Sequence, residues 1–245
     1  IDHVQPQNEV FANQLFPSCV WSAEDLSEFT EDYLIPRLDK DHPGVEVYYG
    51  TLNADSIEYV ETLLENSPDI GGIGVQWAGL DMIDEMRERF PDMNIMQTES
   101  ECNNGMNNWF TARHTYDLLH QSFTDGANSY MYWNMILNDL GLSTWMWRQN
   151  SMISIDRFTK EVVYNPEYYI MKHFSHFVKR GAVRIDVQNQ NPDLKPVAFR
   201  NEDGQIILVL WNVSETRESI KVAISDYKSE IEVPANSIST VVIDI

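Results

Sequence analysis

The chain has 245 residues, 43% of them apolar, which is enough for one large domain or two small ones. Its net charge of −21 repels phosphate backbones, so we expect no nucleic-acid binding. Because the sequence contains no apolar run of about 18 residues or more, we also expect no membrane span.

The first part of the chain alternates predicted strands and helices. Residues 1–4 are typical of the end of a strand, and they lead into Asn8 and Glu9. A capping-box-like start at Ser22 predicts a helix through Leu38. Further strands are predicted at 45–50, 70–77, 94–99 and 128–134, and further helices at 55–65, 80–90 and 109–123. This order is typical of an α/β fold with parallel strands.

The pattern changes toward the end of the chain. After a long loop at 135–150, Pro166 opens a helix that Gly181 closes. Short alternating runs then predict antiparallel strands at 183–187, 196–199, 206–211, 219–223, 229–233 and 238–243. We therefore divide the chain into an α/β region, residues 1–181, and a small β domain, residues 182–245.

The cysteines and histidines give no pattern typical of a metal site. Cys19 and Cys102 follow the two segments discussed next; a disulfide between them is compatible with the sequence, but we favour two buried free thiols. His173 and His176 lie three residues apart on a predicted helix, with no carboxylate or cysteine in register. We expect these histidines to be structural and the protein to bind no metal.

The tripeptide at residues 212–214 matches the sequon for N-glycosylation. The Asn212 side chain could equally form hydrogen bonds at the end of a strand. The sequence leaves both interpretations open.

Glu9 and Glu99 each follow an apolar strand and are about 90 residues apart. In a barrel of β-α units of roughly 30 residues, this spacing places them three strands apart, at the strand ends where reactive groups lie. A retaining glycosidase needs two carboxyl groups about 5 Å apart, one to protonate the leaving oxygen and one to attack the anomeric carbon. Different surroundings can separate the pKa values of such a pair. Glu101 is an alternative nucleophile, but we prefer Glu99 because Glu101 lies beyond the strand end.

Tryptophans gather near the predicted strand ends. A tryptophan ring stacks on the apolar C–H face of a sugar, although any single tryptophan can equally belong to a core. Several at one rim favour a sugar-binding site. The members of this group are Trp77, Trp109, Trp133, Trp145 and Trp147.

Several of these segments resemble glycoside hydrolase family 30, which includes the glucosylceramidases. Residues 4–9 with 16–21 resemble the acid/base segment, residues 97–100 the nucleophile segment, and residues 132–134 the last barrel strand. Residues 166–177 resemble the final barrel helix. The resemblance covers essentially the whole chain. It implies the C-terminal part of a TIM (β/α)8 barrel, with the second half of the catalytic barrel at 1–181 and a β-sandwich at 182–245.

The resemblance also implies roles for individual residues. Glu9 would be the acid/base, Glu99 the nucleophile, and Asn8 the residue that binds the sugar 2-hydroxyl. The other expected substrate-binding residues are Gln76, Trp77, Trp133, Asn134 and Trp147. Gln76 stands where the family often has histidine, and it can donate a hydrogen bond but cannot carry a proton. The expected activity is retaining hydrolysis of neutral β-linked sugars without a cofactor, on β-glucosides such as glucosylceramide-like lipids or β-1,6-glucan.

The family's barrel has eight strands, whereas this chain starts at the end of the fourth. We therefore expect a separate polypeptide that carries the N-terminal half of the barrel. The alternatives are a non-catalytic, carbohydrate-binding remnant and a half-barrel that only completes its partner. The resemblance implies an extracellular or periplasmic location, or a lysosomal one if the source is eukaryotic.

Overall fold

A computed structural model describes residues 1–99 and 101–244. The chain divides into two compact units, which are described separately. The first unit comprises residues 1–105, 121–135 and 140–150, and the second comprises 106–120, 136–139 and 151–245. The domain boundary that the sequence predicts after residue 181 stays a prediction.

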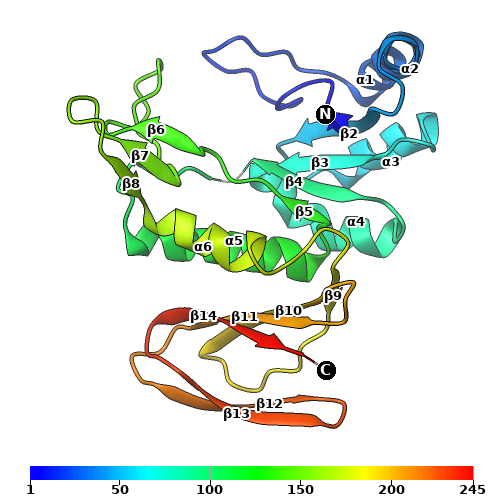
Figure 1. Cartoon of the computed structure of the whole chain (residues 1–245). Helices are drawn as coiled ribbons and strands as arrows, with labels where there is room; N and C mark the ends of the chain where they lie inside the picture. The colour runs from blue at the N-terminus through cyan, green and yellow to red at the C-terminus, as the bar shows by residue number, and fades with distance from the viewer. Residues whose placement is uncertain (100, 245) are drawn as a thin grey trace. The chain divides into compact units, whose positions relative to one another are not determined.

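A five-stranded parallel sheet forms the centre of the first unit, with its strands in sequence order (Figure 1). The strands are β1 (His3–Val4), β2 (Glu46–Leu52), β3 (Gly72–Gln76), β4 (Ile95–Glu99) and β5 (Ser129–Tyr130). Successive parallel strands joined through helices are the arrangement from which a (β/α)8 barrel is built. Because every strand runs the same way, all five carboxyl ends lie along one edge of the sheet.

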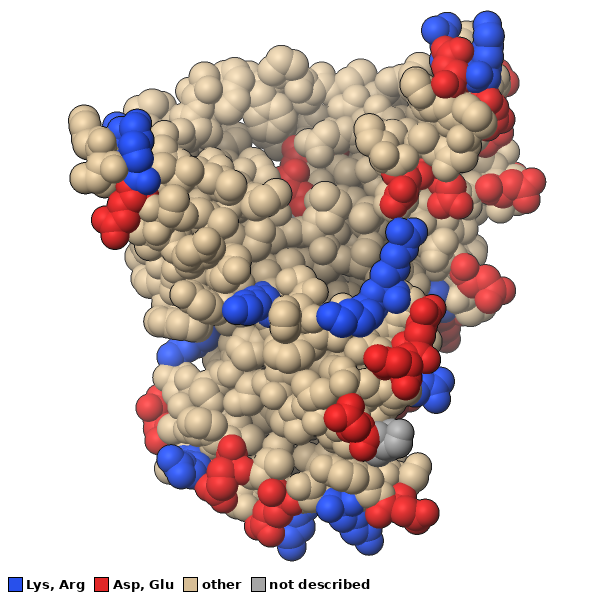
Figure 2. All heavy atoms as spheres, viewed as in Figure 1, with Lys and Arg blue, Asp and Glu red and all other residues tan. Residues whose placement is uncertain are grey.

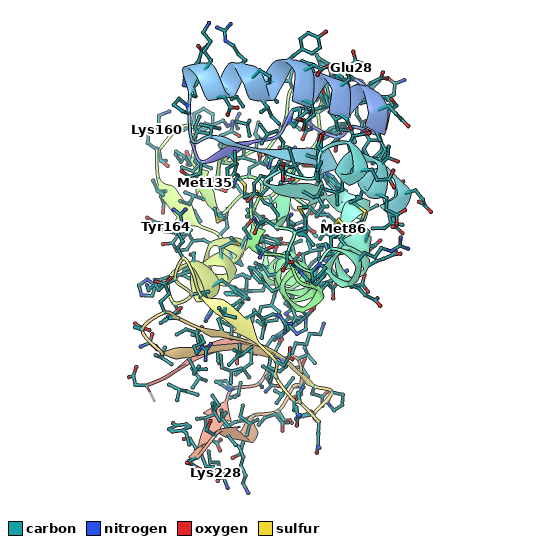
Figure 3. The ribbon with its side chains drawn as sticks, turned by 90° about the vertical axis from the view of Figure 1, so that its right-hand side faces the viewer. Glu28, Met86, Met135, Lys160, Tyr164 and Lys228 are labelled. Carbon is teal, nitrogen blue, oxygen red and sulfur yellow. The ribbon has the colours of Figure 1, made fainter. Side chains whose placement is uncertain are left out.

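Helices connect the first four strands. They are α1 (Ala23–Phe29), a π-helical turn (Thr30–Leu34), α2 (Ile35–Asp41), α3 (Ile57–Asn66), a 3-10 helix (Trp77–Met82) and α4 (Ile83–Arg89). The Ser22 hydroxyl caps α1 by accepting from the Asp25 N–H at 3.1 Å, as the sequence predicts. The helix predicted to end at Leu38 continues to Asp41 through the π-helical turn. Glu28 lies on the exposed face of this helical segment (Figure 3).

Fully buried aliphatic side chains hold the first unit together. Leu52, Ile73, Val75 and Ile95 come from the sheet, and Val60 comes from α3. Burying each such side chain contributes about 1.5–3 kcal/mol. Strands β2 and β3 are buried almost throughout, because a parallel sheet of this kind is covered on both faces.

In the second unit, a small three-stranded sheet precedes the last helix. Its strands are β6 (Ile136–Asn138), β7 (Ile153–Ile155) and β8 (Val162–Tyr164), followed by α6 (Pro166–Ser175). Because β6 lies within residues 135–150, the prediction of one continuous loop there is wrong. The sequence gives no clear strand signal for β6, β7 or β8, because each strand has only three residues. The ring of Tyr164 contacts Tyr168 with a centroid separation of 4.7 Å where β8 gives way to α6 (Figure 3).

Helix α5 (Trp109–Asp125) begins in the second unit and ends in the first. Helix α6 stops at Ser175, six residues before the predicted end at Gly181. Residues of α5 and α6 contact the sheet that follows: the Tyr116 hydroxyl donates to the Lys195 carbonyl at 2.7 Å, and the rings of Phe174 and Phe199 lie 6.3 Å apart.

The rest of the second unit is a β-sandwich. A four-stranded antiparallel sheet in the order β14-β11-β10-β9 faces the hairpin β12-β13 (Figure 1). The strands are β9 (Val183–Ile185), β10 (Leu194–Arg200), β11 (Ile206–Asn212), β12 (Glu218–Ile224), β13 (Tyr227–Val233) and β14 (Ser237–Ile243). The parallel sheet and this sandwich confirm the predicted fold class, part of a TIM barrel followed by a β-sandwich.

The core of the sandwich forms between its two sheets. Leu208 and Leu210 of β11 pack there with Val233, and Ile220 and Val222 of β12 join them. The opposite face of β11 turns toward α5 and α6. All seven residues of β11 are therefore buried, which explains why this strand is a continuous apolar run rather than an alternating one.

Both cysteines are free thiols. The prediction that both are buried is wrong for Cys19, which lies exposed in the irregular segment between β1 and α1. Burial raises the pKa of the Cys102 thiol to about 11. His173 Nδ1 lies 2.8 Å from the Thr240 hydroxyl, and residues 1–99 and 101–244 contain no cluster of three or more metal-ligating side chains. None of the helices formed by these residues has the length and apolar character needed to cross a bilayer.

Asn212 ends β11 with its side chain fully buried. Its amide Nδ2 donates to the carbonyls of Thr216 at 2.9 Å and Pro234 at 3.0 Å. Its Oδ1 accepts from the Ser214 N–H at 3.0 Å and from the Ser214 hydroxyl at 2.8 Å. The side chain is thus a hydrogen-bonding element at the strand end, and a glycan on Nδ2 is incompatible with this burial.

Replacing Asn212 with alanine should therefore destabilise the fold. Several buried groups lose their partners together, so we expect the free energy of unfolding to fall by about 2 kcal/mol, measured by urea denaturation. The exposed Gln190→Ala, in the same unit, serves as the control and should change little. Equal stability of both variants would contradict the structural role of Asn212.

Candidate active site

Glu9 lies beyond the carboxyl end of β1, where the backbone makes a sharp turn. Its φ of 53° is in the left-handed region, which a residue with a side chain adopts only under constraint. The Glu9 N–H donates to the Thr51 hydroxyl at 3.0 Å, and this bond holds the turn against β2. The side chain is 8% exposed, and its buried Oε2 has no hydrogen-bond partner. Such an unsatisfied carboxylate oxygen is rare unless a ligand uses it.

Glu99 is the last residue of β4 and lies opposite Gln76 in the register of β3 and β4. Its Oε1 accepts a hydrogen bond from the indole Nε1 of Trp77 at 3.2 Å. Trp77 follows β3 directly and has a φ of 51°, so its backbone is also in the left-handed region. Its ring is 37% exposed, which leaves part of its surface open to a ligand.

The two carboxyl groups interact electrostatically. Burial raises the pKa of Glu99 to about 7, the bond from Trp77 opposes this rise, and the negative charge of Glu9 adds to it. Carboxylate atoms are also visible recessed in an otherwise charge-poor part of the surface (Figure 2). A carboxyl group whose pKa is about 7, such as that of Glu99, can take up or release a proton near neutral pH, as acid–base catalysis requires.

A chain of hydrogen bonds holds Asn8 beside the carboxyl groups. Asn8 Oδ1 accepts from the Thr51 hydroxyl at 3.2 Å and from Gln76 Nε2 at 3.5 Å. Gln76 is fully buried, and its Oε1 accepts from the Thr98 hydroxyl at 3.3 Å. The structure thus brings together Asn8, Gln76, Trp77 and both glutamates. The sequence analysis missed Thr51 and Thr98; the only signal was their position at strand ends.

Asn134 and Trp133 follow β5. Asn134 Nδ2 donates to the side-chain oxygen of Gln149 at 3.2 Å, so Asn134 is fixed by the segment that follows it. Trp133 is half-buried. Both residues lie in the first unit with the carboxyl groups, but their contacts leave the predicted sugar-binding roles as predictions.

Aromatic rings cluster on the loop segments of the first unit. Phe16 lies 6.3 Å from Trp145 and 5.9 Å from Trp147, measured between ring centroids. Trp145 and Trp147 are each more than two-fifths exposed. Trp109 differs from these residues, because it belongs to the second unit, where its ring stacks with that of Tyr169.

The alternative nucleophile Glu101 lies beyond the end of β4 and is half-buried. Its negative charge, like that of Glu99, contributes to the raised pKa of Cys102. Ser100, the last residue of the predicted nucleophile segment, lies outside the described residues. The preference for Glu99 therefore stays a prediction, based on its place at the strand end.

Comparisons with known proteins relate the chain to sugar-cleaving enzymes. Residues 181–241 match the glycosyl hydrolase family 30 beta sandwich domain. The chain is 28% identical over 193 residues to "Putative glucosylceramidase 4" of Caenorhabditis elegans, an alignment that covers 71% of this chain. The solved structure of SrfJ from Salmonella typhimurium matches with a TM-score of 0.91 and 24% identity over 99% of this chain. That of an endo-β1,6-glucanase matches with a TM-score of 0.88 and 21% identity over 98%.

The chain is short by comparison with these proteins. The alignment covers 37% of the Caenorhabditis elegans protein, and the structural matches cover 57% of each solved chain. At such low identities the solved structures support the fold alone. The comparisons therefore do not identify the activity, the substrates or the partners of the whole protein.

Two substitutions should move the pKa of Glu99 in opposite directions. Glu9→Gln removes a negative charge, so the pKa should fall by roughly one pH unit. Trp77→Phe removes a hydrogen bond to the carboxylate, so the pKa should rise above about 7. Carboxyl ¹³C NMR titration of protein labelled at glutamate measures both, with the signal assigned by its loss in Glu99→Gln. Shifts of the same sign would refute this account of the pair.

Glu99 should also make the stability depend on pH. Its folded-state pKa of about 7 exceeds the unfolded value of about 4.3, so the protein is stabilised while Glu99 is protonated. This contribution is complete below about pH 4.3 and is lost as the pH rises through 7. Glu99→Gln should therefore lose less stability than the wild type between these pH values, as measured by urea denaturation. The exposed Glu88→Gln is the control and should follow the wild type.

Proposed function

We propose that this chain supplies both catalytic carboxyl groups of a retaining β-glycosidase, in keeping with its match to the glycosyl hydrolase family 30 beta sandwich domain and its similarity to putative glucosylceramidases. The observation that carries the proposal is the electrostatically coupled pair Glu9 and Glu99, recessed at the carboxyl ends of β1 and β4. Two carboxyl groups at this edge of a barrel are the components of a double displacement.

In the first step, a carboxylate oxygen of Glu99 attacks the anomeric carbon. At the same time the Glu9 carboxyl group protonates the departing glycosidic oxygen, and the bond between that oxygen and the anomeric carbon breaks. In the second step, Glu9 removes a proton from a water molecule. The resulting nucleophile attacks the anomeric carbon and releases Glu99. The proton returns to Glu9, so the pair is restored.

This scheme requires the proton on Glu9 and the negative charge on Glu99. Burial opposes the charge on Glu99, and the Trp77 indole supplies one donor against that effect. A second donor to Glu99 has to come from a substrate hydroxyl or from further barrel strands. The raised pKa of Glu99 favours one alternative specifically, in which Glu99 is the acid and Glu9 the nucleophile.

The neighbouring side chains suit a neutral sugar. Thr51 and Gln76 hold the side chain of Asn8, which we assign to the sugar 2-hydroxyl, while the partly exposed ring of Trp77 offers an apolar face. The negative charge of the chain disfavours acidic polysaccharides over long distances. β-Glucosides are therefore the proposed substrate class; the names of the relatives suggest glucosylceramide-like lipids and β-1,6-glucan as candidates.

We propose that further barrel strands complete the site. In the described part of the chain, β1 and β5 are the two edges of the parallel sheet. Unpaired edges of a parallel sheet expose backbone N–H and C=O groups that other strands satisfy. An N-terminal half-barrel, expected as a separate polypeptide, fits these edges. Native mass spectrometry should detect a bound chain of similar size, whereas a stable folded monomer would contradict the need for a partner.

A non-catalytic role is the second candidate. A chain that holds sugars without cleaving them would use the same exposed tryptophans. It would not need two interacting carboxyl groups, one of them with a pKa raised to about 7. For location we propose the cell exterior or periplasm, or the lysosome in a eukaryotic source, in keeping with the murine lysosomal acid glucosylceramidase among its relatives.

Covalent trapping should test this function directly. The protein, with any chain that co-purifies, is incubated with an activated 2-deoxy-2-fluoro-β-glucoside and its peptides are mapped by mass spectrometry. The fluorine slows hydrolysis of the glycosyl-enzyme, so we expect stoichiometric label on Glu99. A label on Glu9 would reverse the roles, and a label on neither, with a partner present, would exclude glucosides.

Variants of the carboxyl groups sharpen this experiment. Glu99→Gln should abolish labelling, because the amide is a poor nucleophile. Glu9→Ala should still be labelled by a reagent whose leaving group needs no protonation. The matched control Glu101→Gln should be labelled as the wild type is. Loss of label in Glu101→Gln and not in Glu99→Gln would move the nucleophile to Glu101.

A further inference from the structure

The second unit contains a pocket that the proposed reaction does not use. It has a volume of about 410 Å³ and is lined by the first turns of α5, by α6, and by the turn between β13 and β14. This volume lies within the range of small-molecule sites. All of its lining residues belong to the second unit, whereas both candidate catalytic glutamates belong to the first.

Two exposed aromatic rings line this pocket. Trp109 is 54% exposed and Tyr169 is 44% exposed, although large aromatic side chains are usually buried. Their ring centroids lie 6.5 Å apart, and the ring planes are inclined by only 26°. The two rings are therefore roughly parallel, and each leaves part of its apolar surface open to a ligand. Ile170 and Trp211, both buried, also line the pocket.

A cation without a partner lies in the same pocket. Arg113 stands one turn after Trp109 on α5 and is half-buried. In the part of the chain that the structure describes, its guanidinium has no hydrogen bond and no ion pair. This is unusual in a chain with 38 acidic residues and only 17 lysines and arginines. Five N–H donors of Arg113 are thus available to oxygen atoms of a ligand.

The other polar groups of the pocket are neutral. Burial lowers the pKa of His173, and the charge of Lys172 lowers it further, so the imidazole is uncharged at pH 7. The side chains of Asn236 and Ser237 add an amide and a hydroxyl. The pocket therefore offers aromatic faces, one guanidinium, and neutral donors and acceptors.

We propose that this pocket is a second carbohydrate site, which the second unit forms by itself and which holds a neutral β-linked glucosyl segment. The C–H face of a glucose ring would pack on the exposed surface of Trp109 or Tyr169, and its hydroxyl oxygens would accept from Arg113. The choice of glucose rests on the proposed function. All residues that line this site belong to the second unit, so the site can bind a sugar independently of the catalytic pair.

The ligand chemistry follows from these groups taken together. An acidic sugar would form an ion pair with Arg113, but the net charge of −21 opposes its approach. A purely apolar ligand would leave the guanidinium unsatisfied and half-buried. A neutral sugar avoids both problems. It is not repelled by the negative charge of the chain, and it has an apolar face for the aromatic rings and many hydroxyl oxygens for Arg113.

Titration of the Glu99→Gln chain with a soluble β-linked gluco-oligosaccharide tests the proposal. This variant cannot cleave the ligand if the proposed function is correct, and the readout depends on binding alone. The indole ¹H–¹⁵N signal of Trp109, assigned by its loss in Trp109→Phe, should shift and saturate. An unshifted signal, or tighter binding of an oligosaccharide of glucuronic acid, would overturn the proposal.

Further variants separate this pocket from the catalytic region. Tyr169→Ala and Arg113→Gln should each weaken the affinity reported by Trp109 about tenfold. Phe158→Ala removes another exposed aromatic ring of the second unit and should leave the affinity unchanged. If covalent trapping fails while the Trp109 signal still responds to the oligosaccharide, glucoside hydrolysis is refuted and the second site is supported.

Discussion

Parallel strand pairing is the constraint on which the candidate site depends. When β1 to β4 run in the same direction, Glu9 and Glu99 reach the same edge of the sheet although about 90 residues separate them. The register then places Gln76 opposite Glu99, and the end of β2 brings Thr51 to the turn at Glu9. The arrangement of these side chains therefore follows from the backbone hydrogen bonds that pair the parallel strands.

The same edge concentrates groups that do not favour folding. Glu9 has a left-handed backbone and a buried oxygen without a partner, Trp77 has a left-handed backbone, and Glu99 is buried enough to raise its pKa. Such features persist only where the surrounding structure enforces them, and they are concentrated at functional sites. The fully buried aliphatic core of β2 to β4 supplies that enforcement. The same strands therefore supply both the stabilising core and the proposed catalytic groups.

In the second unit, different elements cover the two faces of the four-stranded sheet. The β12-β13 hairpin covers one face of the four-stranded sheet, and residues of α5 and α6 contact the other face. The proposed sugar pocket lies where these helices meet the turn before β14. Helices that complete the core therefore also present Trp109 and Tyr169 outward, because an amphipathic helix has a second face that packing leaves open.

The sequence by itself determined the strand and helix order, the antiparallel character of the β domain, and the residues Glu9 and Glu99 at strand ends, because these depend on local periodicity and turn signals. It could not determine the short strands β6 to β8, the exposure of Cys19, or the use of Asn212 as a strand-end hydrogen bonder. Nor could it find Thr51 and Thr98, or separate Trp109 from the other tryptophans. Those features depend on contacts between residues distant in the chain, which only the tertiary structure decides.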